Sequence, residues 1–206
     1  GGPCANHCVE LGGNDAVVVA PGTALSSGSS FMIGAYVTID AAPAAVAGII
    51  ERTQGTEGYA LRLTPLRHVS LTVFADTPCS VISTAEVPAD GMPHHVLGSY
   101  ENGVAHVRID GGSAMQVPCN GTFEAPPIAS LFIGRGLDGR LDDVFYSDDG
   151  IAPSDPFVAP TAGSCGSARF LLDFEPPPDP PLANVCPESV PPGGQQGSPA
   201  FVCCDG

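Results

Sequence analysis

The chain has 206 residues, of which 26 are glycine and 22 are proline, and its formal net charge at pH 7 is −15. Glycine and proline at this density exclude a helical bundle, because the longest stretch without either residue is 66–77. The acidic excess argues against binding of nucleic acid or anionic lipid, since both require a basic surface, and no apolar run is long enough to insert across a membrane.

Residues 9–150 contain a series of short segments that are typical of β-strands. Residues 31–39 alternate, with Phe31, Ile33 and Val37 on one face, which indicates a half-buried strand. Asn102 and Gly103 separate two further segments, and both residue types accept the positive φ angles of a tight hairpin. About ten short strands with frequent turns predict an all-β fold, an antiparallel β-sandwich or jelly roll. The other expected strands are residues 16–19, 49–50, 59–63, 69–73, 81–84, 95–100, 104–109, 131–133 and 141–146.

The composition changes after Gly150. Residues 151–206 contain 12 prolines and four cysteines, and they have too few apolar residues for a core of their own. We therefore expect a jelly roll over residues 1–150, with a short cysteine-containing N-terminal arm, and a Pro/Cys-rich extension over residues 151–206. One strand-like segment, residues 168–175, is expected to pack on the sandwich. It either pairs within its own chain or completes the sheet of a neighbouring copy.

The eight cysteines favour disulfide bonds and an oxidising, extracellular compartment. Zinc is the alternative, but Cys4 and Cys8 with His7 are the only near match to its ligand spacing and lack a second half. Cys79 and Cys119 each follow a proline in a connection between strands, so we expect them to pair. The other cysteines would tie the N-terminal arm to the extension: Cys4, Cys8, Cys165, Cys186, Cys203 and Cys204. Because the chain begins with neither Met nor an apolar leader, we expect a secreted, processed form.

Five segments carry a resemblance to one extracellular family. They are GGNDAVVV (12–19), SFMIGAYV (30–37), GYALRL (58–63), and the stretches 92–111 and 133–144. In this order they resemble the laminin-G-like, concanavalin A-like lectin/glucanase jelly-roll domain. The two tryptophans that this family usually carries are replaced here by tyrosine, at position 36, and proline, at position 93, which weakens a conventional lectin interpretation.

The resemblance also implies a calcium ion that joins the opening loop to the last strand of the sandwich. Asp142 is the best side-chain candidate, Asp15 follows the opening turn, and Gly13 and Asn14 would offer carbonyl oxygens. Calcium takes six to eight oxygen ligands, which carboxylates and carbonyls on adjacent strands supply. The alternative is that these acidic residues are solvated surface groups.

The histidine pair has a structural interpretation. Adjacent residues on a strand face opposite ways, so His94 and His95 cannot easily serve one metal or general-base site. The resemblance implies that one of them packs inside and the other lies near the surface. His106, on the paired strand, is a candidate cross-strand neighbour.

No catalytic signature accompanies the predicted fold. The E-x-D-x-x-E triplet of related glycoside hydrolases, the G-x-S-x-G elbow and the phosphate loop do not occur. We therefore expect a secreted, non-enzymatic module that binds an extracellular glycan or protein, with Tyr36, Tyr59, Tyr100 and Phe132 as candidate exposed aromatic residues. The alternatives are a structural subunit of a fibre, surface layer or complex, assembled through the C-terminal extension with copies of itself or other subunits, and, remotely, a degenerate glycoside hydrolase. Asn120 begins an Asn-Gly-Thr sequon and is a candidate glycosylation site.

Overall fold

The computed structural model describes residues 7–21, 30–121, 123, 126, 128–151, 168–172, 193–196 and 200–203. Every regular element in these ranges is a β-strand, and none of them contains a helix that could cross a membrane. The strands are β1 (His7–Leu11), β2 (Ala16–Val19), β3 (Phe31–Thr38), β4 (Ala47–Gln54), β5 (Glu57–Leu63), β6 (His68–Phe74), β7 (Cys79–Glu86), β8 (His94–Glu101), β9 (Val104–Ile109), β10 (Met115–Pro118), β11 (Leu131–Ile133), β12 (Gly139–Ser147), β13 (Ala168–Leu172), β14 (Gly193–Gln196) and β15 (Ala200–Cys203).

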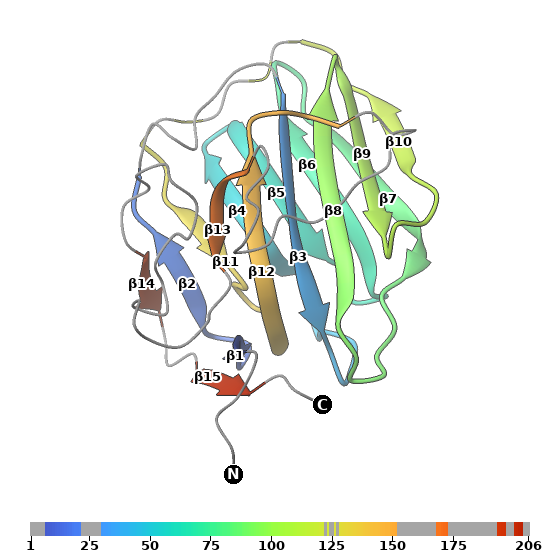
Figure 1. Cartoon of the computed structure of the whole chain (residues 1–206). Coiled ribbons are helices and arrows are strands. Elements are labelled where there is room, and N and C mark those ends of the chain that lie inside the picture. The colour runs from blue at the N-terminus through green and yellow to red at the C-terminus, as the bar shows by residue number, and fades with distance from the viewer. Residues whose placement is uncertain are drawn as a thin grey trace.

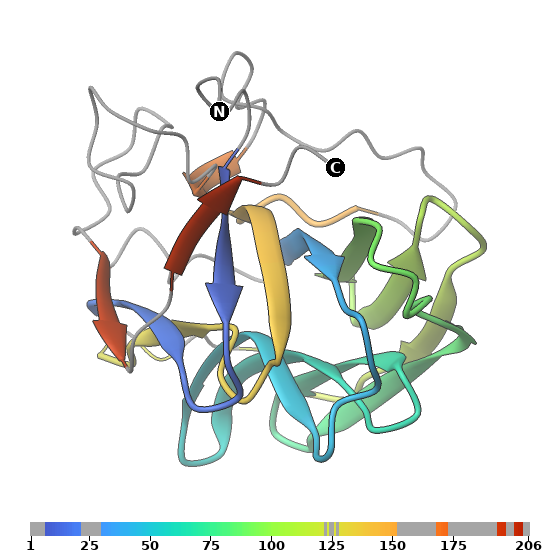
Figure 2. The same cartoon turned by 90° about the horizontal axis from the view of Figure 1, so that it is seen from below.

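The strands form two antiparallel sheets stacked face to face (Figure 1), and the two layers are separate when seen from below (Figure 2). Sheet A has the order β10-β9-β8-β3-β12-β1-β15, and β13 also pairs with β12. Sheet B has the order β14-β2-β11-β4-β5-β6-β7. The predicted antiparallel β-sandwich is therefore confirmed.

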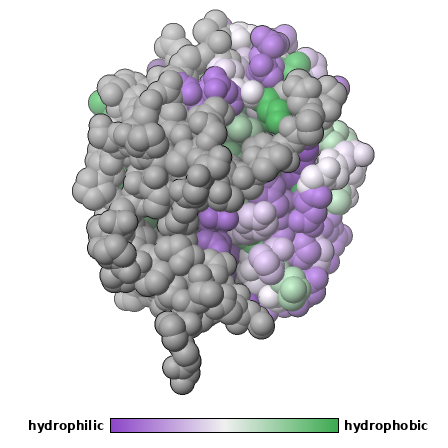
Figure 3. All heavy atoms as spheres, viewed as in Figure 1, coloured by the Kyte–Doolittle hydropathy of each residue, from purple (hydrophilic) through white to green (hydrophobic). Residues whose placement is uncertain are grey.

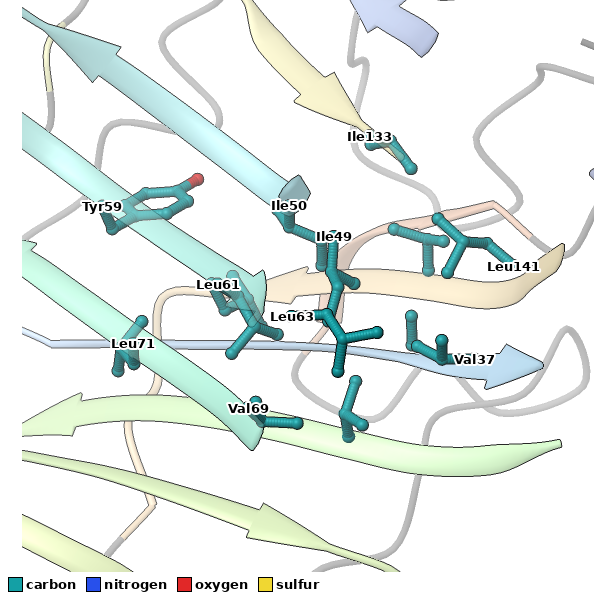
Figure 4. Packing of buried hydrophobic residues seen from close by; sticks show 14 of the residues in the cluster. Val37, Ile49, Ile50, Tyr59, Leu61, Leu63, Val69, Leu71, Ile133 and Leu141 are labelled. Atoms are coloured by element: carbon teal, nitrogen blue, oxygen red, sulfur yellow. The ribbon is translucent and has the colours of Figure 1, made fainter. Parts of the chain in front are cut away.

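The hydrophobic core lies between the two sheets and takes alternate residues from each strand. Phe31, Ile33 and Val37 of β3 have no exposed surface, and Leu71 and Val73 of β6 meet this layer from the opposite sheet. Figure 4 shows how side chains of both sheets converge there. Each such side chain stabilises the fold by about 1.5–3 kcal/mol through burial of apolar area. The intervening residues project to the outer faces of the sheets.

The predicted hairpin joins β8 to β9. Asn102 and Gly103 have φ angles of 51° and 77°, so both central residues of the turn lie in the left-handed region. A two-residue turn of this kind matches the right-handed twist of the flanking strands. The turn sets the register in which Ser99 lies opposite His106.

Three strands of the C-terminal region extend the sandwich. β13 pairs antiparallel with β12, placing Leu172 opposite Val144 within the same chain. β14 pairs with β2 at one end of sheet B, and β15 pairs with β1 at one end of sheet A. Residues 173–175 of the expected segment 168–175 lie outside the described residues. β1, β10, β14 and β15 had no sequence prediction, because their short runs carry little apolar periodicity.

A disulfide joins the two sheets at the edges opposite to β15 and β14. Cys79, at the start of β7, is bonded to Cys119, directly after β10, with the Cα atoms 5.5 Å apart. This is the predicted pair, and it links the outermost strands of sheets B and A. Cys8 is also disulfide-bonded, to a partner outside the described side chains, and none of the described cysteines is free. Of Cys203 only the backbone is described, and Cys4, Cys165, Cys186 and Cys204 lie outside the described residues.

Candidate functional site

A cavity of about 520 Å³ lies beside the outer face of sheet A. We call it the Tyr36 cavity; it is lined by Cys8, Tyr36, Thr38, Gly91, Met92, Pro93, Arg140, Leu141, Asp142 and Asp143. Its walls thus come from β1, β3, β12 and the loop that precedes β8. The volume falls in the range of sites that hold small ligands. Figure 3 views the molecule from the outer side of sheet A, and the part of this face drawn in colour is largely hydrophilic.

Tyr36 forms the aromatic wall of the cavity. It lies between the core residues Ala35 and Val37 of β3, so the pleat directs its ring to the outer face of the sheet. Its neighbours in the sheet are Asp142 of β12 and His95 of β8. The Tyr36 ring meets the imidazole of His95 edge to face, with centroids 5.1 Å apart, which fixes its orientation.

A β-bulge in β12 brings two carboxylates to the cavity. The pairing of β12 with β3 shifts register between Asp142 and Phe145, and Asp143 has a φ angle of 45°. A bulge places two consecutive residues opposite one residue of the partner strand, so both aspartates line the cavity. The backbone N–H of Asp143 donates to Asp142 Oδ1 at 2.8 Å, which orients that carboxylate.

The electrostatic character of the cavity is acidic. Partial burial raises the pKa of the Tyr36 hydroxyl, and the carboxylates of Asp143, Asp110 and Asp142 raise it further. Arg140 supplies a positive charge on the same strand as Asp142. The cavity is therefore lined by two carboxylates, a guanidinium and one aromatic surface.

His94 and two aspartates hold the strand end that adjoins the cavity. The ring nitrogens of His94 contact Asp110 Oδ2 at 2.7 Å and Asp90 Oδ1 at 3.1 Å, and the His95 N–H donates to Asp110 Oδ1 at 2.9 Å. Burial lowers the pKa of His94, but the hydrogen bonds to Asp110 and Asp90 outweigh it, and the pKa is raised overall. The pKa of Asp90 is lowered by the backbone N–H of Met92 and by His94. These bonds fix the loop that carries Met92 against the end of β8.

The residues predicted as calcium ligands lie in two different places. Asp142 lines the Tyr36 cavity, whereas Gly13 lines a second cavity of about 560 Å³ between the β1–β2 turn and the loops around Asp40 and Asp138. Asp15 closes its own turn, because its Oδ2 accepts the N–H of Gly12 at 3.0 Å. The backbone N–H of Asn14 also bonds within this turn, to the Gly12 carbonyl.

The predicted calcium ligands are thus not gathered in one cavity. No group of three or more His, Cys, Asp or Glu side chains among the described residues is arranged to hold a metal ion. Calcium takes six to eight oxygen ligands, and its binding by these residues stays a prediction.

His94 and His95 face opposite sides of β8, as predicted, because His94 lies opposite the core residue Val37 and His95 lies opposite Tyr36 on the outer face of sheet A. Burial lowers the pKa of His95 to about 4, and its ring stacks on Phe145 with centroids 6.3 Å apart. The His94 side chain is 14% exposed and contacts the carboxylates of Asp90 and Asp110. His106 lies opposite Ser99 rather than His95, is fully buried, and has no hydrogen-bond partner for its ring nitrogens among the described residues. Burial and Arg108 lower the pKa of His106 to about 4.

The aromatic candidates divide between the core and the outer faces. Tyr59 and Tyr100 are buried core residues with exposures of 0% and 3%, so they are not available to a ligand. Tyr36 and Phe132 are half-buried on the outer faces of sheets A and B. The exposed sequon residue Asn120 directly follows the bonded Cys119.

Sequence reasoning missed Arg140 and Met92 as cavity residues. Arg140 stands two residues before Asp142 on the same strand, and the period of two places both on one face, so this signal was present. Met92 belongs to an irregular loop and is 60% exposed, and nothing in the local sequence marks it.

The domain assignment follows from a comparison with protein families. The model of the concanavalin A-like lectin/glucanases superfamily (Laminin_G_3) matches residues 11–149. The chain belongs to this superfamily. The match spans β2 to β12 and therefore includes Tyr36, Asp142 and Asp143 of the cavity, while β13 to β15 lie beyond it.

Solved structures share the concanavalin-like jelly roll at low sequence identity. A Bacteroides ovatus ATCC 8483 protein, provisionally described as carbohydrate binding, superposes with a TM-score of 0.73 and 13% identity over 99% of this chain and 61% of its own. The heptameric SAP-like pentraxin of Limulus polyphemus superposes with a TM-score of 0.63 and 12% identity, over 98% of this chain and 96% of its own. Domains LG4–5 of the mouse laminin α1 chain superpose with a TM-score of 0.58 and 14% identity, over 77% of this chain and 46% of their own.

These likenesses are similarities of fold alone. The chain spans less than two thirds of the Bacteroides protein and less than half of the laminin fragment. None of the curated proteins matches the chain significantly in sequence. The superfamily contains lectin-like and glucanase folds, and the specific ligand has to be argued from the site.

Proposed function

We propose that this chain is an extracellular, non-catalytic binding module that takes a glycan in the Tyr36 cavity. The observation that carries the proposal is the combination of one aromatic ring, two bulge-positioned carboxylates and one guanidinium around a cavity of about 520 Å³. Sugar hydroxyls donate to carboxylates and accept from guanidinium groups, while the apolar face of a sugar ring packs on an aromatic side chain.

The extracellular setting is supported by the disulfides. The Cys79–Cys119 bond and the bonded Cys8 are typical of oxidising compartments, because cytosolic thiols are kept reduced. The lack of a catalytic role is proposed from the site itself. Asp142 and Asp143 are consecutive residues on one strand, whereas glycoside hydrolysis uses two carboxyl groups that flank the scissile bond from opposite sides.

Binding of purified protein to a glycan array, followed by calorimetry on the best ligand, tests the proposal. Tyr36→Ala removes the aromatic wall and Asp142→Asn removes one acceptor charge, so each is expected to weaken binding roughly tenfold or more. Thr84→Ala, on the exposed side of β7, is the matched control and should bind as the parent does. Equal binding by the parent, Tyr36→Ala and Thr84→Ala would overturn the assignment of the cavity.

The assembly role remains a prediction with a separate test. It requires the C-terminal strands to pair with a neighbouring molecule, whereas β13, β14 and β15 are paired with strands of their own chain. The glycan-binding role is therefore preferred. A concentration-independent monomer mass by light scattering agrees with this preference, and a stable oligomer would instead favour the structural-subunit role.

A further inference from the structure

A second group of functional side chains lies on the outer face of sheet B, away from the Tyr36 cavity. Glu51 of β4, Arg62 of β5 and Phe132 of β11 each lie next to core residues on their strands. Figure 4 shows the core neighbours Ile50, Leu61 and Ile133 between the sheets. Because neighbouring residues of a strand face opposite ways, Glu51, Arg62 and Phe132 project outward.

One carboxylate holds two guanidinium groups at this place. Glu51 Oε1 accepts from Arg62 Nε at 2.6 Å, and Glu51 Oε2 accepts from Nη2 and Nε of Arg135 at 2.6 and 3.0 Å. The guanidinium of Arg135 also lies over the Phe132 ring, 4.6 Å from its centroid. Gly48 makes room for the carboxylate, since a Cβ at this position would come within 2.6 Å of Glu51 Oε2. The group of Glu51, Arg62, Arg135 and Phe132 is called the arginine cradle below.

The arginine cradle keeps unused hydrogen-bond donors. Both Nη groups of Arg62 and Nη1 of Arg135 have no hydrogen-bond partner in the described part of the chain. The side chains of Arg62 and Arg135 are 31% and 47% exposed, whereas Glu51 is only 6% exposed. The carboxylate is thus covered and the outward-facing surface consists of guanidinium N–H groups.

The arginine cradle has a net positive charge on an otherwise acidic protein. Two guanidinium charges and one carboxylate sum to +1, whereas the chain as a whole carries −15 with only seven basic residues. Arg67, another arginine of this sheet region, is compensated by its own ion pair with Glu86. Two oriented guanidinium groups are well suited to bidentate recognition of a planar anion.

We propose that Arg62 and Arg135, held in place by Glu51, bind the carboxylate of an acidic sugar unit in a glycan. A net charge of +1 balances one singly charged group, which favours a carboxylate over a doubly charged phosphate. Hydroxyl groups on the same face, including the hydrogen-bonded pair Thr72 and Ser80, suit a polyhydroxylated ligand. The choice of a glycan rests on the proposed function, while the site is separate from the Tyr36 cavity.

The experiment compares oligogalacturonate with its methyl ester by isothermal titration calorimetry on the full chain. The two probes differ in charge but not in sugar, so the ester is expected to bind at least tenfold more weakly. Binding of oligogalacturonate should also weaken as salt is raised, because the contact is electrostatic and partly exposed. A sulfated oligosaccharide forms a third arm, and its preference over the carboxylate would overturn the assignment of the acid group.

Three variants distinguish recognition from a structural role. Arg135→Gln and Arg62→Gln should each weaken oligogalacturonate binding about tenfold without affecting the ester. Arg67→Gln is the matched control, since Arg67 has the same 31% exposure and its own acidic partner, and it should bind as the parent does. Glu51→Gln removes the carboxylate that holds both guanidinium groups and should also weaken oligogalacturonate binding, although it raises the cradle charge to +2.

The outcomes separate this inference from the proposed function. Equal binding of the acid and the ester, with no effect of Arg135→Gln, would overturn the arginine cradle while leaving glycan binding at the Tyr36 cavity intact. Acid-selective binding that is lost in Arg135→Gln and retained in Tyr36→Ala supports the cradle. Folding of every variant is checked by its thermal midpoint, and a folded Arg135→Gln that binds like the parent overturns the proposal.

Discussion

The Cys79–Cys119 disulfide offers a prediction whose magnitude follows from the structure. The bond joins residues 40 positions apart and links the outermost strands of the two sheets. In the chain-entropy description, closing a loop of this size removes about 13 cal/mol/K from the unfolded ensemble, which is about 4 kcal/mol at 25 °C. The double variant Cys79→Ala/Cys119→Ala should therefore be less stable by about 4 kcal/mol, and its thermal midpoint should fall by about 8–16 °C.

Urea unfolding followed by far-UV circular dichroism measures this loss, since the chain has no tryptophan. Because the removed cross-link acts on the unfolded state, the urea m-value should rise as that state expands. Thr84→Ala, on β7 and exposed, is the control and should change stability by no more than about 0.5 kcal/mol. A loss below about 1 kcal/mol with an unchanged m-value would refute loop closure as the source of stabilisation.

Three further predictions concern titration, packing and metal binding. The folded pKa values of His95 and His106 are about 4, against about 6.5 in the unfolded chain, so the unfolded chain binds more protons between these pH values and stability should fall by up to about 3 kcal/mol per histidine as pH drops from 6.5 to 4. His106→Gln should make this decline shallower in urea unfolding measured at several pH values, and a decline as steep as the parent's would contradict the assignment. Gly48→Ala should displace the Glu51 carboxylate from its ion pairs and cost about 1–2 kcal/mol, measured by urea unfolding, and an unchanged midpoint would show that the carboxylate moves freely. If calcium binds, chelator should lower the thermal midpoint of the parent but not of Asp142→Asn, and identical midpoints with and without chelator would remove Asp142 from the ligand set.

The strand pattern was readable from sequence because burial imposes a period of two. Residues 31–39 alternate between core and outer face, and β3 occupies Phe31–Thr38 with the expected side in the core. The predicted half-burial was wrong, because the outward residues other than Tyr36 are buried as well. The Asn102-Gly103 turn was readable because few residue pairs accept two consecutive positive φ angles. These are local constraints, and each acts on neighbouring residues of the chain.

The interior also contains a charged residue whose burial the hydrophobic periodicity did not predict. Arg52 faces the core on β4 and is fully buried, and its Nε donates to the Ala129 carbonyl at 3.2 Å. A charged side chain can occupy such a position only when distant groups satisfy it, and the loop that contains Ala129 lies 77 residues away. The pairing of β14 with β2 is non-local in the same way, since Gly193 lies opposite Val19.

The sequence by itself determined the all-β architecture and the superfamily, because alternation, turn residues and motif order are properties of the linear chain. Only the tertiary structure decided which charged groups meet. The bulge that sets Asp142 and Asp143 against Tyr36, and the approach of Arg135 to Glu51, depend on strand register and on loop paths between segments far apart in sequence. Register is fixed by the packing of the whole sandwich, so the places of these site residues emerge only when both sheets are assembled.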